Sequence, residues 1–87
     1  MKKIGIVSHK EMEEIKSLYE RRSGLNELAK VLSPNDKELY DKLVKDLGET
    51  SLKYQDWWNR MAAKYGWEGR DGGNWQINFD TCDIYLN

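Results

Sequence analysis

The chain has 87 residues, which suffices for a single domain (residues 1–87) and leaves no room for a second. Its 14 basic and 15 acidic side chains give a formal net charge of −1, so it lacks the basic excess that nucleic-acid binding requires. Four Trp and five Tyr residues are many for so small a protein. Composition therefore indicates a small aromatic-rich domain and excludes a general nucleic-acid binder.

A lone cysteine, Cys82, cannot form an intramolecular disulfide or supply a thiolate zinc site by itself, and it fits a reducing compartment. No apolar run approaches the roughly 20 residues of a transmembrane helix. The apolar stretch that follows Lys2 and Lys3 is too short for a signal peptide. We therefore expect a cytoplasmic protein with no membrane partner.

Residues 4–7 predict a short strand with Ile4 and Ile6 on one face. Ser8 and Glu11 match a capping box, so a helix is expected to begin there. Apolar residues then recur at helical spacing at Met12, Ile15, Leu18, Tyr19, Leu25, Leu28, Ala29 and Leu32. Gly24 weakens this helix by roughly 1 kcal/mol relative to alanine. One long helix with a weak or kinked middle is favoured over two shorter helices.

Ser33 and Pro34 predict the start of a second helix, because serine caps helices and proline suits the first helical position. The connection is short, so this helix is expected to run antiparallel to the first. Its apolar stripe consists of Leu39, Tyr40, Leu43, Val44 and Leu47. Gly48 is predicted to end it, and Thr50 or Ser51 to cap a third helix.

The third predicted helix is the most aromatic part of the chain, and Gly66 is expected to end it. Its apolar positions are Tyr54, Trp57, Trp58, Met61, Ala62 and Tyr65. Neighbouring helical positions lie about 100° apart, so Trp57 and Trp58 are both buried only beneath a wide cover. Two interpretations remain open: both rings belong to the core, or one lies exposed at the rim beside Trp67 and docks a partner.

The segment that follows predicts a turn at Asp71–Asn74, since it lacks the Lys-Ser/Thr of a P-loop and the spaced carboxylates of an EF-hand. We therefore expect no metal and no cofactor there. The next residues alternate in polarity, with apolar side chains first at odd and then at even positions: Trp75, Ile77 and Phe79, then Cys82, Ile84 and Leu86. The parity changes at Asp80-Thr81, which lacks the glycine of a two-residue hairpin turn, so a bulge or a break between two strands is expected.

The fold expected from these elements is α+β and mostly α. It consists of a three-helix unit and a small terminal β-sheet, made of the N-terminal strand and one or two C-terminal strands. Outside the helices, Cys82 is interpreted as a buried inert thiol, and pairing with His9, the single histidine, is the alternative. Arg21 and Arg22 are either a solvated face or a clamp for a carboxylate or phosphate. No catalytic constellation is recognisable, so we expect a protein that is not an enzyme.

Several stretches resemble a known family, and they span nearly the whole chain. They are Leu18–Arg21, Gly24-Leu25, Leu39–Thr50, Trp57-Trp58, Lys64-Tyr65 and Gly73–Leu86. In them the chain resembles CXXX-repeat peptide modification system proteins, small accessory proteins encoded beside a cysteine-repeat precursor peptide and a radical-SAM maturase. The resemblance implies a role in the maturation of ribosomally synthesised peptides and assigns no catalytic residue.

Three hypotheses follow. The first is a non-catalytic accessory protein that binds the precursor peptide, the maturase or both, at a sheet edge or in a groove between the helices. Its candidate partner-binding residues are Trp57, Trp58, Trp67, Arg21 and Arg22. The second is a helical module that self-associates as a homodimer. The third is a cysteine enzyme that uses Cys82.

Overall fold

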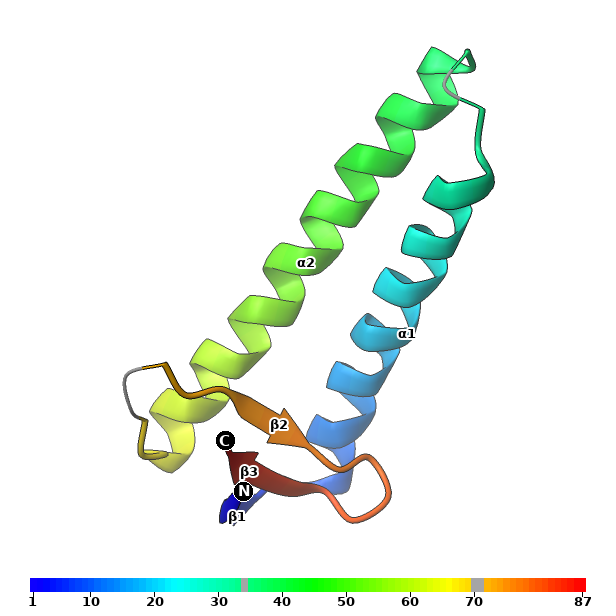
Figure 1. The fold of residues 1–87 in the computed structure, drawn as a ribbon. Coiled ribbons are helices and arrows are strands. Elements are labelled where there is room, and N and C mark those ends of the chain that lie inside the picture. Colours follow the sequence, from blue (N-terminus) through cyan, green and yellow to red (C-terminus); the bar gives the residue numbers. More distant parts are fainter. Residues whose placement is uncertain (34, 70–71) are drawn as a thin grey trace.

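The computed structural model describes residues 1–33, 35–69 and 72–87. It shows an α+β fold, mostly α, in which two long antiparallel helices carry a small sheet at one end (Figure 1). The elements are β1 (Lys2–Ile6), α1 (His9–Val31), α2 (Lys37–Tyr65), β2 (Trp75–Ile77) and β3 (Asp83–Leu86). None of the helices in the described part of the chain combines the length and apolar character needed to cross a membrane.

Helix α1 begins at the predicted capping box. The Ser8 hydroxyl accepts a hydrogen bond from the Glu11 backbone N–H at 3.1 Å, and the Glu11 carboxylate accepts one from the Ser8 N–H at 2.9 Å. The helix continues without a break through the exposed Gly24. The interpretation as one long helix is therefore confirmed.

The predicted three-helix unit is wrong, because residues 37–65 form one continuous helix, α2. Gly48 does not end it, and Thr50 lies inside it, 2% exposed, rather than capping a new helix. The core-facing positions keep their helical phase across the glycine, at Leu43, Leu47, Thr50, Tyr54 and Trp57. Packing of this unbroken stripe against α1 outweighs the roughly 1 kcal/mol by which glycine disfavours a helix. Gly66, at φ +63°, ends α2 as predicted.

The start of α2 also differs from the expectation. Its N-cap is Asp36, whose carboxylate accepts a hydrogen bond from the Leu39 backbone N–H, and not Ser33. Ser33 instead closes the preceding turn, since its carbonyl accepts from the Asp36 N–H at 3.1 Å. Pro34, predicted at the first helical position, lies outside the described residues, as does Asp71 of the predicted 71–74 turn.

The sheet is antiparallel with the order β1-β3-β2, so the first and last strands of the chain pair directly. An irregularity between Lys3 and Gly5 leaves Ile4 without a partner on β3, which is a β-bulge. The expectation that Ile4 and Ile6 share one face is wrong for this reason. Ile4 packs against the core, whereas Ile6 is 56% exposed.

A loop of residues 78–82 joins β2 to β3 and contains the predicted change of parity. The Asn78 carbonyl accepts from the Cys82 N–H at 2.8 Å, and the Asn78 N–H donates to the Asp83 carbonyl at 2.9 Å. Cys82 adopts a positive φ of 65°. The break between two strands expected at Asp80-Thr81 is therefore confirmed, and a left-handed residue supplies the reversal that the Asp-Thr pair lacks.

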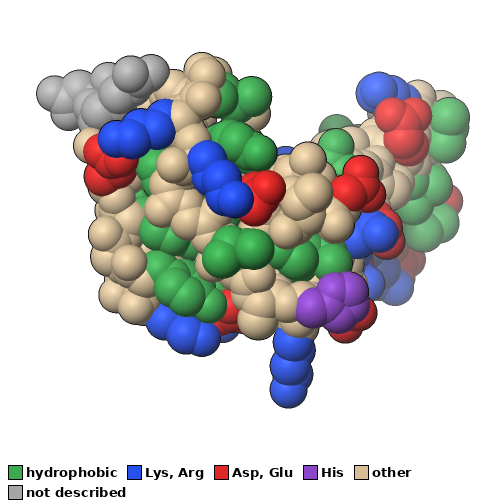
Figure 2. Space-filling view, turned by 90° about the horizontal axis from the view of Figure 1, so that it is seen from below, with side chains coloured by type: hydrophobic (Ala, Val, Ile, Leu, Met, Phe, Trp, Pro, Cys, Tyr) green, Lys and Arg blue, Asp and Glu red, His purple; other side chains and the backbone are tan. Residues whose placement is uncertain are grey.

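The core lies between the sheet, the N-terminal part of α1 and the C-terminal part of α2. Its buried members are Val7, Met12, Ile15, Trp57, Trp58, Met61 and Ile84. The Trp57 indole N–H donates to the Glu11 carbonyl at 3.1 Å and so ties α2 to the first turn of α1. Seen from the sheet end, apolar side chains lie among charged ones of both signs (Figure 2).

Candidate functional site

The two adjacent tryptophans are both buried, with Trp57 0% and Trp58 6% exposed. Of the two interpretations of this pair, the one that places both rings in the core is confirmed, and the one with an exposed ring at the rim is wrong. The sheet and Trp67 supply the wide cover that the pair needs. Trp75 stacks near Trp58 with ring centres 6.4 Å apart, and Trp67 lies 6.1 Å from it. Trp67 itself is half-buried and stacks on Tyr65 at 5.7 Å.

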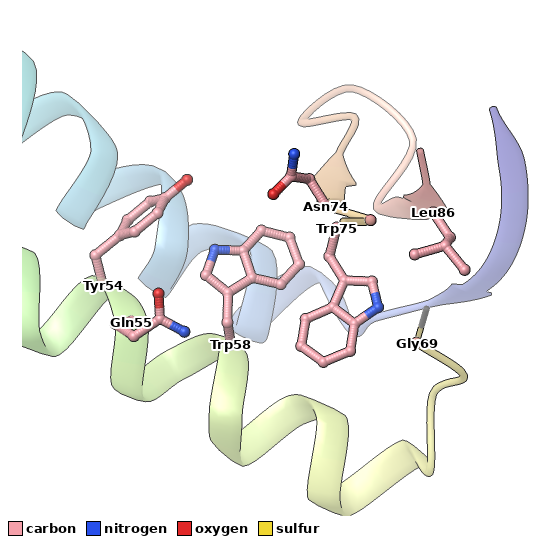
Figure 3. A pocket seen from close by; sticks show the side chains of 8 residues that line it. Tyr54, Gln55, Trp58, Gly69, Asn74, Trp75 and Leu86 are labelled. Carbon is pink, nitrogen blue, oxygen red and sulfur yellow. The ribbon is translucent and has the colours of Figure 1, made fainter. Parts of the chain in front are cut away.

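Two hollows open beside this aromatic cluster and share three of their lining side chains, Tyr54, Trp58 and Trp75. The larger, of about 460 Å³, extends toward Gly69 and Leu86. The smaller, of about 360 Å³, extends along β2 and is also lined by Tyr19, Gln76, Ile77 and Phe79. We call their union the aromatic groove. In Figure 3, which shows the larger hollow, the rings of Trp58 and Trp75 lie side by side, and Tyr54 stands one turn away on α2.

One wall of the groove is the open edge of the sheet. The order β1-β3-β2 leaves β2 paired on one side only. Asn74 and Asn87 exchange both backbone hydrogen bonds, and Trp75 faces Leu86 in the register. Because hydrogen-bonded and non-bonded pairs alternate along an antiparallel ladder, the N–H and C=O groups of Trp75 and Ile77 point away from β3. Those backbone groups face the open edge.

The face of β2 that is turned toward the helices carries apolar side chains. Trp75 and Ile77 project toward the helices together with their partners across the ladder, Leu86 and Ile84. Tyr19 of α1 completes the far end, since its ring lies 5.6 Å from that of Phe79. Helices α1 and α2 therefore supply tyrosine and tryptophan rings opposite an exposed strand edge.

The two arginines interpreted as either a solvated face or a clamp have different environments. Arg21 lies 2.7 Å from the Asp46 carboxylate, and the hydrogen bond to Asp46 raises the pKa of the guanidinium. Arg22 lies over the ring of Tyr54, 4.1 Å from its centre. The structure does not join the two into one clamp, because Arg21 bridges α1 to α2 whereas Arg22 covers a residue of the aromatic groove.

The two residues of the cysteine-enzyme hypothesis, His9 and Cys82, have different partners. His9 lies 2.8 Å from Glu13 on the exposed first turns of α1, and Cys82 is half-buried against the core. Across residues 1–33, 35–69 and 72–87, no group of three or more His, Cys, Asp and Glu side chains is placed to hold a metal ion.

Sequence reasoning named Trp58, Arg22 and a sheet edge, but it missed Tyr19, Phe79 and the fact that β2 supplies the edge beside the groove. The alternation of Trp75 and Ile77 signals a half-buried strand. It does not show that β3 enters the middle of the sheet and leaves β2 at the edge, since that depends on long-range pairing.

The groove presents aromatic rings, amides and unpaired strand backbone, all of which suit binding of an extended chain. Comparisons with protein-family models, curated protein sequences and solved structures find no match to this chain.

Proposed function

We propose that the protein is a non-catalytic adaptor that binds an extended peptide, which adds a strand to the edge of β2 and lies in the aromatic groove. The observation that carries the proposal is the outward direction of the Trp75 and Ile77 backbone groups beside that groove. An exposed strand edge is a template for a further strand, because its donors and acceptors are already aligned.

The added strand would pair with β2, and every second side chain would point into the groove. Main-chain hydrogen bonds to Trp75 and Ile77 would supply affinity for any extended segment. The rings of Tyr19, Tyr54 and Trp58 would select the side chains that enter. The buried Trp58 therefore contributes to binding as part of the groove and not as an exposed docking residue.

The biological setting of this adaptor follows from the family resemblance. We assign the peptide to the precursor of a ribosomal-peptide modification system and the second partner to its radical-SAM maturase. An adaptor of this kind needs two surfaces, and peptide bound along β2 would leave the far half of the helical hairpin uncovered. Recovery of a cysteine-repeat peptide or its maturase with this protein as bait in its native cell is the expected result. Recovery of neither would contradict this assignment.

Substitution at Ile77 tests strand addition. Ile77→Pro removes an N–H that points away from β3, so the β2–β3 ladder keeps its hydrogen bonds. Ile77→Ala shortens the side chain to a comparable degree and keeps the N–H. Both variants and the parent protein would be panned against a random peptide library displayed on phage, and enriched peptides would then be titrated by fluorescence polarisation.

We expect Ile77→Pro to weaken peptide binding about tenfold more than Ile77→Ala, as loss of a main-chain hydrogen bond in a strand pair predicts. Circular dichroism would establish that both variants are folded. Equal affinities of the two variants for the enriched peptides would exclude pairing with the edge of β2.

A second candidate function, self-association, is favoured by the apolar side chains at the far end of the hairpin. Leu39 and Val44 of α2 are 50% and 52% exposed, and Leu28 of α1 is 46% exposed. Two such hairpins would bury these residues as a four-helix bundle. Light scattering that gives a concentration-independent dimer, lost in Val44→Lys, would support it. A monomer at high concentration would exclude it.

A further inference from the structure

Arg22 is a cationic residue that lies beside the aromatic groove. It lies on α1 one turn after Tyr19, and its guanidinium stacks 4.1 Å from the ring centre of Tyr54. Tyr19 lines one of the two hollows and Tyr54 lines both. Arg22 is thus held beside the groove by a ring that forms part of its wall.

Within residues 1–33, 35–69 and 72–87, the N–H groups of this guanidinium have no hydrogen-bond acceptor. Arg21 bonds to Asp46, and Arg60 bonds to Glu14 and Asp56. Among the residues that the structure describes, Arg22 forms no ion pair and no hydrogen bond through its side chain. Stacking uses only the flat face of a guanidinium, so the N–H groups at its edge remain free to bind a planar anion.

The described lining of the groove carries no charge of its own. The described residues that line both hollows are aromatic, aliphatic, amide or glycine and carry no formal charge. A cation beside a partly enclosed surface whose described lining is uncharged attracts an anion more strongly than it would in open water. An acidic group on the bound chain would therefore be complementary to this end of the groove.

We infer that Arg22 binds the side-chain carboxylate of an Asp or Glu in the extended peptide that occupies the groove, an inference that rests on the proposed function. Arg22 belongs to α1, across the groove from β2. A strand added to the edge of β2 would lie about 4.8 Å from β2 itself. A group that reaches Arg22 must project sideways from this strand toward the helices, as side chains on its inner face do. A side-chain carboxylate fits this direction better than the end of the chain.

The test uses peptide selection with a matched pair of arginine variants. A random peptide library, displayed with its C-terminus fused to the coat protein, would be selected on the parent protein, Arg22→Gln and Arg21→Gln. We expect the parent and Arg21→Gln to enrich Asp or Glu at one fixed position relative to the apolar residues. Arg22→Gln should enrich the same apolar pattern without Asp or Glu at that position. Arg22→Lys should partly restore the enrichment of Asp or Glu.

Synthetic versions of the best peptide then measure the interaction directly. Replacing its acidic residue by the corresponding amide should weaken binding to the parent about tenfold at low salt and leave binding to Arg22→Gln unchanged. Acid enrichment that persists in Arg22→Gln would overturn the inference. So would a loss of binding on C-terminal amidation alone, which would assign the anion to a chain end.

The two proposals fail in different ways. Peptides that bind, depend on the N–H of residue 77 and show no acidic preference would overturn the role of Arg22 and leave strand addition intact. A library from which no protein variant enriches any peptide would overturn both.

Discussion

The two ends of the helical hairpin are built from similar stripes but are packed differently. At the sheet end, Ile15, Trp57 and Ile84 are completely buried. At the far end, Val31 is 80% and Leu39 50% exposed. Two helices alone cannot enclose an apolar stripe, since each covers only one side of the other. The third layer exists only where the sheet lies, so burial is concentrated at one end.

This contrast places most of the stability of the protein at the sheet end. Removing a buried side chain there should unfold the molecule, whereas changes near the far end should act locally. Four substitutions test this difference, from the largest expected effect to the smallest.

Trp57→Ala should destabilise the protein by about 3–5 kcal/mol, because it removes a fully buried ring and the hydrogen bond to the Glu11 carbonyl. For so small a domain this is a large part of the total stability. Urea unfolding followed by circular dichroism would measure it. Leu52→Ala is the control, since Leu52 is 73% exposed and should change stability by less than about 0.5 kcal/mol. Equal losses in the two variants would contradict the concentration of the core at the sheet.

Glu11→Gln should remove a pH-dependent part of the stability. Burial raises the pKa of Glu11, but hydrogen bonds from Lys64, Tyr65 and Ser8 outweigh it and lower the pKa from 4.5 to about 2. Lys64 lies 2.7 Å from the carboxylate, which joins the start of α1 to the end of α2. A lowered pKa means that the ionised form favours the folded state.

The stabilisation by Glu11 is therefore complete above about pH 4.5 and is lost as the pH falls toward 2. At neutral pH it amounts to at most about 3 kcal/mol. Unfolding free energies of the parent and Glu11→Gln should differ at pH 7 and converge near pH 2. A difference in unfolding free energy that stays constant across this pH range would show that these contacts do not favour the ionised form of Glu11.

Gly5→Ala should destabilise the sheet by about 1–3 kcal/mol. A Cβ at this position would lie 2.8 Å from the Trp67 indole nitrogen, so the ring or the strand must move. Gly69→Ala is the matched control, since the Trp75 ring, its nearest neighbour among the described residues, would lie at an ordinary 3.8 Å from the added methyl. Thermal unfolding of the two variants would compare them. A tolerated alanine at position 5 would show that Trp67 does not pack on β1.

Gly48→Ala should stabilise the protein by about 0.5–1 kcal/mol, because the residue lies within α2. Beyond the adjoining residues and the nearby backbone of the helix itself, no described atom lies within 4 Å of the added methyl. Gly24→Ala should act alike in α1. Thermal unfolding with helix content from circular dichroism would measure both. Destabilisation at position 48 would restore the break between two helices that the sequence predicted.

Local signals predicted the parts of the fold that depend on neighbouring residues. The Ser8–Glu11 capping box and the Gly66 stop are contacts within one turn. Gly48 was misinterpreted because its local signal, a glycine after an apolar stripe, is the same for a stop and for a tolerated interior position. Only the packing of α2 against α1 distinguishes the two.

The candidate site was predicted less completely, because it is assembled by long-range contacts. Arg22 was identified from its residue type, but its position over Tyr54 depends on the alignment of the two helices. The sequence leaves open whether Trp57 and Trp58 are both covered. Their joint burial depends on a strand order that places Trp75 over the pair.

The central place of β3 in the sheet has a consequence for synthesis on the ribosome. Residues 83–86 follow every other element in the chain, yet both β1 and β2 pair through them. The helices can form as they emerge, whereas the sheet that covers Trp57 and Trp58 must wait for the last strand. A chain whose helices have formed while β3 is still unpaired would therefore leave Trp57 and Trp58 without their cover, open to chaperones and to aggregation.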